Sequence, residues 1–183
     1  SNVNLNGVNI SIQYNPARIV STGAKVDPKS ISKRPCFLCD ANRPAEQIDL
    51  PLWGKYNLLV NPFPILPEHF TIPLRSHTPQ RIWENYEDMM RIASSLDDYF
   101  VFYNGPKCGA SAPDHMHFQA GKRGDVPLER DWDEIYWKKR TRIYPISDEE
   151  YAEASSLEEI VDHAGMYSLR GYLCPGFVIV TRT

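Results

Sequence analysis

This chain of 183 residues has no long apolar run, little net charge and few cysteines. No stretch approaches the roughly 20 consecutive apolar residues that span a bilayer, so we expect no membrane-spanning segment. A net charge of −3 and a pI near 5.9 argue against broad binding of nucleic acid or of an anionic membrane surface. The sequence also has no internal repeat, no low-complexity tract and no convincing linker.

The composition is that of an ordinary globular domain. Hydrophobic residues make up 42% of the chain and charged residues 23%. We expect one domain over residues 1–183 with a sizeable core, and the sequence leaves open whether this domain is a fragment of a longer chain. The four cysteines could form two disulfides, but Cys36 and Cys39 have the spacing of a metal or redox pair. A reducing, cytoplasmic setting is therefore the better expectation.

The pattern of elements indicates an α+β fold. Fifteen prolines fall mostly between the candidate elements. Apolar residues at helical spacing predict one long helix over residues 80–96. The strands around it are close enough in sequence to pair in a mainly antiparallel sheet. We expect these strands at residues 8–14, 56–60, 69–73 and 98–103, with a further one at 115–119.

The C-terminal part, beyond Gly121, is less regular. Residues 128–137 read as a helix or an irregular cover. Ser147 with Glu150 three residues later is the arrangement of a capping box, which predicts a helix reaching His163. Residues 171–181 read as a strand pair.

The most informative motif is His115-x-His117-x-Gln119, with Met116 and Phe118 in between. Alternation of this kind predicts a strand with the two imidazoles and the carboxamide on one face and the apolar residues in the core. Neutral imidazole can act as a nucleophile or a metal ligand, and an amide can donate to a phosphoryl oxygen. The alternative is a polar strand face with two incidental histidines.

Three blocks of this sequence resemble the histidine-triad superfamily. The first runs from Pro67 to His77, the second is Asn104 placed eleven residues before His115, and the third is the His-x-His-x-Gln motif itself. Members of the transferase branch have glutamine in the third block, where the hydrolases have a third histidine. The chain looks closest to that branch, which includes galactose-1-phosphate uridylyltransferase, diadenosine tetraphosphate phosphorylase and GDP-galactose phosphorylase.

The resemblance implies a HIT-like fold and a nucleotidyltransferase or phosphorylase. The donor would be a nucleotide sugar or a dinucleoside polyphosphate, and His117 would form a covalent nucleotidyl-histidine intermediate. Gln119 would accompany transfer to a phosphate or sugar-phosphate acceptor, because an amide is no general acid or base at neutral pH. A homodimer is common in the superfamily. A nucleotide hydrolase of the same superfamily and a non-catalytic nucleotide-binding module remain the alternatives.

Phosphate binding would fall to the turn before the motif. Its donors would be the Asn104 side chain and the main-chain amides of Gly109, Ala110 and Ser111. One residue more than usual separates Ser111 from His115, which leaves the role of the Ser111 hydroxyl open.

The resemblance also implies contacts to the nucleotide. Asn61 stands where the superfamily usually has an acidic residue that binds the ribose hydroxyls. Phe63 would offer a face to the base, with Pro64 and Phe37 as alternatives, although each could equally be core. Arg18 would bind phosphate as a similar N-terminal arginine does in the phosphorylases, or it is a solvated surface residue.

A structural zinc site is the remaining expectation. The uridylyltransferases bind zinc through a CxxC pair and two histidines that match Cys36, Cys39, His77 and His115. Two thiolates and two imidazoles make a closed tetrahedral site, which is structural by preference. Cys108 could replace one ligand. The alternative is that the cysteines are small buried residues and that His77 caps or packs.

Overall fold

The computed structural model describes residues 1–19, 23, 25–132, 140–142, 165–169, 172 and 176–180. The chain divides into two compact units. One is Gln13–Asp125, and the other combines Ser1–Ile12 with Val126–Thr183. That residues 1–183 form a single domain stays a prediction.

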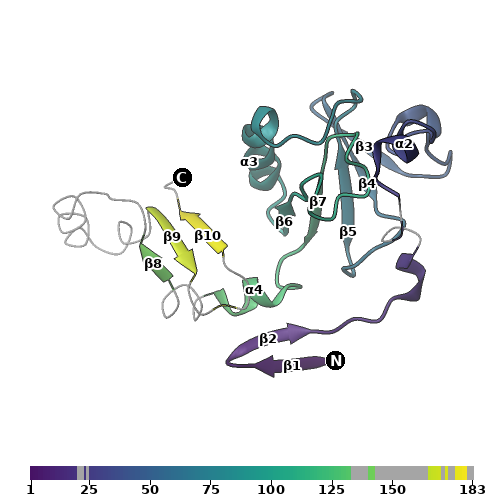
Figure 1. Cartoon of the computed structure of the whole chain (residues 1–183). Coiled ribbons are helices and arrows are strands. Elements are labelled where there is room, and N and C mark those ends of the chain that lie inside the picture. The colour runs from purple at the N-terminus through teal and green to yellow at the C-terminus, as the bar shows by residue number, and fades with distance from the viewer. Residues whose placement is uncertain are drawn as a thin grey trace. The chain divides into compact units, whose positions relative to one another are not determined.

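The unit Gln13–Asp125 is built on a five-stranded antiparallel sheet (Figure 1). The sheet has the strand order β3-β4-β5-β7-β6. This architecture confirms the predicted α+β fold with a mainly antiparallel sheet, and β4 and β5 have the predicted bounds. The strands are β3 (Asp49–Leu52), β4 (Tyr56–Val60), β5 (His69–Pro73), β6 (Tyr99–Phe102) and β7 (His117–Lys122).

One face of this sheet forms the core beneath the helix α3 (Tyr86–Ser95) (Figure 1). The predicted helix over 80–96 begins later, at Tyr86, after the 3-10 turn η3 (Trp83–Asn85). Residues 80–82 do not join it because the Gln80 amide donates to the Pro113 carbonyl and the Gln80 side chain to the His117 carbonyl of β7 instead. The buried core residues are Tyr56, Ile72, Leu74, Ile92, Met116, Phe118 and Ala120.

The opposite face of the sheet carries the polar motif. Met116 and Phe118 are fully buried in the core, so the alternation of strand side chains turns His117 and Gln119 to the other side, as predicted. Strand β7 begins at His117, two residues later than expected. The amide of Met116 donates to the Thr78 carbonyl at 2.7 Å, which takes the preceding residues out of the ladder with β5.

Short elements shape the N-terminal part of this unit. They are η1 (Pro16–Arg18), α2 (Pro28–Ile31) and η2 (Asp40–Asn42). Asp27 caps α2, because its carboxylate accepts from the Ser30 amide at 3.0 Å and Pro28 stands at the first helical position.

The second unit contains a hairpin and a three-stranded sheet. The strands β1 (Asn2–Leu5) and β2 (Val8–Ser11) are joined by Asn6-Gly7, both at positive φ, which suits a tight hairpin turn. The antiparallel sheet has the order β10-β9-β8. Its strands are β8 (Arg140–Arg142), β9 (Gly165–Leu169) and β10 (Gly176–Val180), and the helix α4 spans Pro127–Arg130.

The outcome for the C-terminal predictions is mixed. Part of the predicted pair at 171–181 is present as β10, whose partner β9 lies earlier in the chain. Most of residues 171–175, the end of the segment 128–137 and the predicted helix after Ser147 lie outside the described residues. Among the described helices, none combines the length and apolar character needed to cross a membrane.

Candidate active site and metal centre

His117 is held as a neutral imidazole with one free ring nitrogen. Its Nδ1 lies 2.8 Å from the carbonyl oxygen of His115. A carbonyl only accepts, so the ring proton is on Nδ1 and Nε2 keeps its lone pair. Burial lowers the pKa of His117 below its ordinary value, although the hydrogen bond to His115 acts in the opposite direction. At neutral pH the ring is therefore unprotonated at Nε2, as a nucleophile requires.

Gln119 is oriented by His69 on the neighbouring strand. The amide of Ile65 donates to His69 Nδ1 at 3.1 Å, so the ring proton is on Nε2. Nε2 in turn donates to the Gln119 Oε1 at 2.8 Å. With its oxygen occupied in this way, Gln119 presents its NH₂ group as a donor for an anion. Burial lowers the pKa of His69, and the charge of Arg18 adds to this effect, so the ring stays neutral.

Sequence reasoning did not include His69 among the site residues. It lies in the block from Pro67 to His77 that carries the resemblance, and it alternates with Thr71 on β5. Thr71 is paired in register with Gln119. The alternation was a signal that could have found His69, whereas its tautomer depends on the Ile65 amide and could not be read.

Gln80 was missed as well. Its buried side chain accepts from the His117 amide at 2.7 Å and donates to the His117 carbonyl at 2.9 Å. The same nitrogen donates to the Asn104 carbonyl at 3.0 Å. Sequence analysis assigned Gln80 to the start of a helix, and no sequence signal marked it as part of the site.

The predicted phosphate-binding turn follows β6. Gly109 adopts φ +95°, which favours glycine, and the Cys108 amide donates to the Gly105 carbonyl at 2.9 Å. The Ala110 amide points to the same carbonyl at 3.4 Å, so it is engaged within the turn. Arg34 donates to the Ser111 carbonyl at 3.2 Å and fixes the end of the turn.

Asn61 and Phe63 lie in the turn after β4. The side-chain NH₂ of Asn61 donates to the Thr71 hydroxyl at 3.0 Å, and its side-chain oxygen accepts from the main-chain amide of Phe63 at 2.8 Å. Asn61 thus orders the turn locally, and its bond to Thr71 ties this turn to the polar face of the sheet. Phe63 is half-buried.

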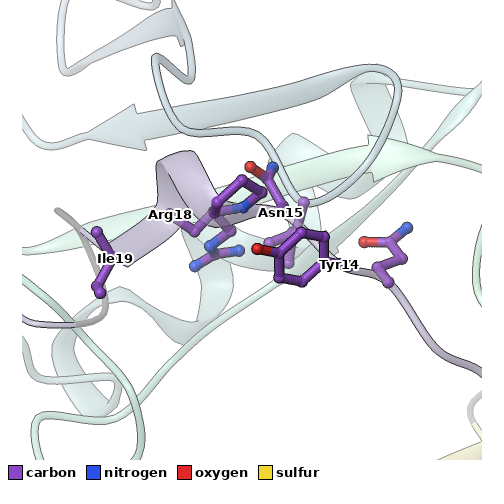
Figure 2. A pocket seen from close by; sticks show the side chains of 7 residues that line it. Tyr14, Asn15, Arg18 and Ile19 are labelled. Carbon is purple, nitrogen blue, oxygen red and sulfur yellow. The ribbon is translucent and has the colours of Figure 1, made fainter.

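A pocket of about 450 Å³ lies at the N-terminal segment of this unit. Tyr14, Arg18 and Ile19 line it together with Ile65, whose amide bonds to His69 (Figure 2). The charge of Arg18 helps to lower the pKa of His69, so the predicted Arg18 lies near the polar face of the sheet. Apolar side chains beside a guanidinium suit a ligand with a flat ring and a phosphate.

The four predicted metal ligands converge. The ligand atoms of Cys36, Cys39, His77 and His115 all lie within 4.8 Å of one another. Cys36 Sγ is 3.2 Å from His115 Nδ1, and Cys39 Sγ is 3.2 Å from His77 Nδ1. Ligands of a tetrahedral zinc ion are separated by roughly 3.3–3.8 Å, given metal–ligand bonds of 2.0–2.3 Å. These four residues could therefore hold a metal ion, and Cys108 is exposed and outside this group.

Their surroundings suit a cation. His115 Nε2 donates to the Leu74 carbonyl at 2.7 Å, which holds the ring with Nδ1 toward the thiols. The side-chain NH₂ of Asn42 donates to the Cys36 carbonyl at 2.9 Å and closes the turn that carries both cysteines.

The two thiols have shifted pKa values. Burial raises the pKa of Cys39 to about 11, with a further contribution from Cys36. The pKa of Cys36 falls to about 6, because the bond with His115 and backbone amides outweigh its burial. A divalent cation would bring both to the thiolate form.

Comparison with known proteins gives one family and one partial relative. The model of the family described as "Domain of unknown function (DUF4922)" matches residues 1–122. A Saccharomyces cerevisiae protein, diadenosine 5',5'''-P1,P4-tetraphosphate phosphorylase 2, is 36% identical over 80 residues. This alignment covers 36% of the present chain and 24% of the yeast protein, so the matched region spans about a quarter of that relative. No solved structure matches.

The partial likeness supports the HIT-like superfamily and a nucleotide-processing enzyme. It does not identify the branch of the superfamily or the substrate. The family model covers more than half of the chain. The chain therefore belongs to the DUF4922 family.

Proposed function

We propose that this chain is a nucleotidyltransferase or phosphorylase that works through a covalent nucleotidyl intermediate on His117. The observation that carries the proposal is the buried imidazole whose Nδ1 proton is bound by the His115 carbonyl, with Nε2 free to attack. The likeness to a diadenosine tetraphosphate phosphorylase supports the same class of reaction. The donor is a nucleotide sugar or a dinucleoside polyphosphate.

The reaction has two displacements at the α-phosphorus. In the first, Nε2 of His117 forms a P–N bond while the P–O bond to the leaving group breaks and its electron pair leaves with that oxygen. The leaving group is a sugar phosphate from a nucleotide sugar, or a nucleoside polyphosphate from a dinucleoside polyphosphate; either is a stable anion and needs no proton from the protein. The His115 carbonyl stabilises the positive charge of the substituted ring. In the second step an acceptor oxygen attacks, the P–N bond breaks and Nε2 recovers its lone pair.

The acceptor is itself a phosphate or a sugar phosphate. Such an acceptor is an anion at neutral pH, whereas water would need a base to remove its proton. Gln119 cannot supply that base, but its NH₂ group can donate to a phosphoryl oxygen in the transition state. The further donors of the proposal are the Asn104 side chain and the main-chain amides of Gly109 and Ser111, because the Ala110 amide is bonded to the Gly105 carbonyl.

The nucleotide lies between the turn after β4 and the pocket that Arg18 and Ile65 line. In the proposal Asn61 binds the ribose, Phe63 contacts the base and Arg18 binds a phosphate. Their common position near the polar face of the sheet supports this arrangement. We also propose a homodimer and a cytoplasmic setting, in which the free thiols of Cys36 and Cys39 stay reduced.

Zinc, in this proposal, has a structural role. Cys36, Cys39, His77 and His115 would hold it and fill all four positions, so that no open site remains for substrate. What the ion supplies is rigidity at His115, whose carbonyl binds the His117 proton.

A covalent adduct tests the proposal. The protein is mixed with nucleotide sugars and dinucleoside tetraphosphates, and intact-mass spectrometry looks for a gain of one nucleotidyl group, that is, of a nucleoside monophosphate less water. An adduct that persists in water and is discharged by phosphate or a sugar phosphate supports the transferase. Turnover in water alone would show a hydrolase, and binding without an adduct would show a binding module. His117→Ala should give no adduct, and His163→Ala, a histidine that the proposal does not use, is the control.

A further inference from the structure

We propose that Gln80 is a positioning residue for His117, one that fixes the attacking imidazole relative to the phosphate-binding turn. This inference rests on the proposed function, because it concerns the geometry of the same site. It adds a residue that neither the sequence motif nor the family match identifies. Its basis is a buried carboxamide that bonds to three main-chain groups.

Gln80 lies where the pairing of two strands ends. Strands β6 and β7 pair with Phe102 opposite Gln119, and the same register would next place Asn104 opposite His117. β6 ends at Phe102, and the side chain of Gln80 takes the place of the missing main-chain bonds. It accepts from the His117 amide and donates to the carbonyls of His117 and Asn104. The carboxamide thus stands between the nucleophile and the first residue of the phosphate-binding segment.

The orientation and identity of this side chain follow from its partners. Its oxygen faces one N–H donor and its nitrogen faces two carbonyl acceptors, so the reversed amide would lose all three bonds. Ionised glutamate could accept but not donate, and methionine could accept only weakly and could not donate. Gln80 is only 1% exposed, so water cannot readily replace the lost partners.

Gln80 is itself fixed at its main chain. Its amide donates to the Pro113 carbonyl at 3.1 Å, and its carbonyl accepts from the Tyr103 hydroxyl at 3.1 Å. Two residues earlier, the Thr78 carbonyl accepts from the Met116 amide at 2.7 Å. The segment is therefore bonded on both sides, and its side chain cannot follow His117 if that residue shifts.

Such fixation matters for the rate of the first displacement. Nε2 of His117 must approach the α-phosphorus to about 3–3.5 Å and in line, while the turn holds the phosphate. A misplacement of about 1 Å costs on the order of 10²-fold in rate. Loss of the Gln80 carboxamide should therefore slow formation of the P–N bond far more than it weakens nucleotide binding.

The test compares Gln80→Met with Asn85→Leu. Asn85 is a second buried amide, bonded to the Tyr56 hydroxyl and the Arg81 carbonyl on the core side, so its loss reports on stability alone. Single-turnover adduct formation in Gln80→Met should fall by about 30–100-fold, with nucleotide Kd changed less than about 3-fold. Asn85→Leu, corrected for its folded fraction, should keep the parent rate. Equal losses in both variants, or a Gln80→Met rate within about 3-fold of the parent, would overturn the inference.

A second measurement does not depend on turnover. The His117 Nδ1 proton, bound to the His115 carbonyl, should give a slowly exchanging imidazole signal in ¹H–¹⁵N spectra of the parent and of Asn85→Leu. Gln80→Met should lose or shift it. If the parent forms no adduct with any nucleotide, the proposed function fails. The imidazole signal then tests by itself whether Gln80 positions His117. An unchanged signal in Gln80→Met would refute the positioning role.

Discussion

His69 on β5 and Gln119 on β7 are diagonal neighbours fifty positions apart in sequence, with the imidazole Nε2 2.8 Å from the side-chain amide oxygen. The Ile65 amide bonds to the other ring nitrogen, so the donor in this pair is the histidine. Gln119 therefore enters the reaction with its NH₂ group already directed away from His69.

Gln119 and His69 should act as one unit. We expect Gln119→Ala to slow adduct formation by roughly 10²–10³-fold, as for the loss of an oxyanion donor. His69→Phe should slow it by about 10-fold, because the amide can then rotate. The double variant should be no slower than Gln119→Ala, since His69 acts through Gln119. Single-turnover rates of the four proteins provide the check, and additive losses would mean that His69 acts by another route.

The stability of the protein should depend on pH through His69. Burial lowers the pKa of this imidazole in the folded state, so as pH falls the unfolded chain takes up the proton first. The contribution of His69 to the free energy of unfolding is then complete above about pH 6.5, the pKa in the unfolded chain. It is lost as the pH falls from there to the pKa of His69 in the folded protein. The slope is at most about 1.4 kcal/mol per pH unit.

His69→Phe isolates this contribution. Urea unfolding of the parent and of the variant between pH 7.5 and pH 5 gives the difference in free energy at each pH. We expect the parent to lose stability faster than the variant as pH falls. Parallel curves would show that His69 does not titrate with folding.

The metal site predicts a stoichiometry. Protein prepared without chelator should contain about one zinc per chain, bound by the group of two thiols and two imidazoles. Cys36→Ser combined with Cys39→Ser should lower both the metal content and the Tm. Cys108→Ser, at an exposed thiol outside the group, should leave both unchanged. Absence of metal from the parent, together with an unaltered Tm in the double variant, would defeat the assignment.

Substitution of His117 and of His115 should have different effects on adduct formation and on metal content. His117→Ala should abolish the adduct and lower turnover by several orders of magnitude while the metal content stays, because no neighbouring group forms the covalent bond. His115→Ala should lose metal and thermal stability first. Metal analysis and intact-mass spectrometry on both variants make the comparison. The reverse pattern would mean that the roles of the two residues are exchanged.

Much of the sheet was predictable because local signals agree there. Asn61-Pro62-Phe63-Pro64 cannot continue a strand, which sets the end of β4, and the alternation around His117 gave the correct core face. The start of β7 was not predictable. It depends on the Met116 amide bonding to Thr78, a contact between segments remote in sequence.

The candidate site divides in the same way. The CxxC spacing and two histidines predicted a ligand group that does converge. The roles of His69 and Gln80 were hidden, because each is determined by a partner on β7, which is remote in sequence: Gln119 for His69 and His117 for Gln80. Neither a buried glutamine nor a ring tautomer leaves a local pattern in the sequence.

The ligand group also bears on how the chain folds. Cys36 and His115 are 79 residues apart, so a metal ion bound to both would cross-link the chain and close most of the unit Gln13–Asp125 into a loop, as a disulfide would. Closing a loop of that length costs about 4.5 kcal/mol of chain entropy, by the relation used for disulfides. An ion that binds early would remove this cost from the later steps of folding. Refolding of this protein should therefore be faster with zinc present from the start than with zinc added after collapse.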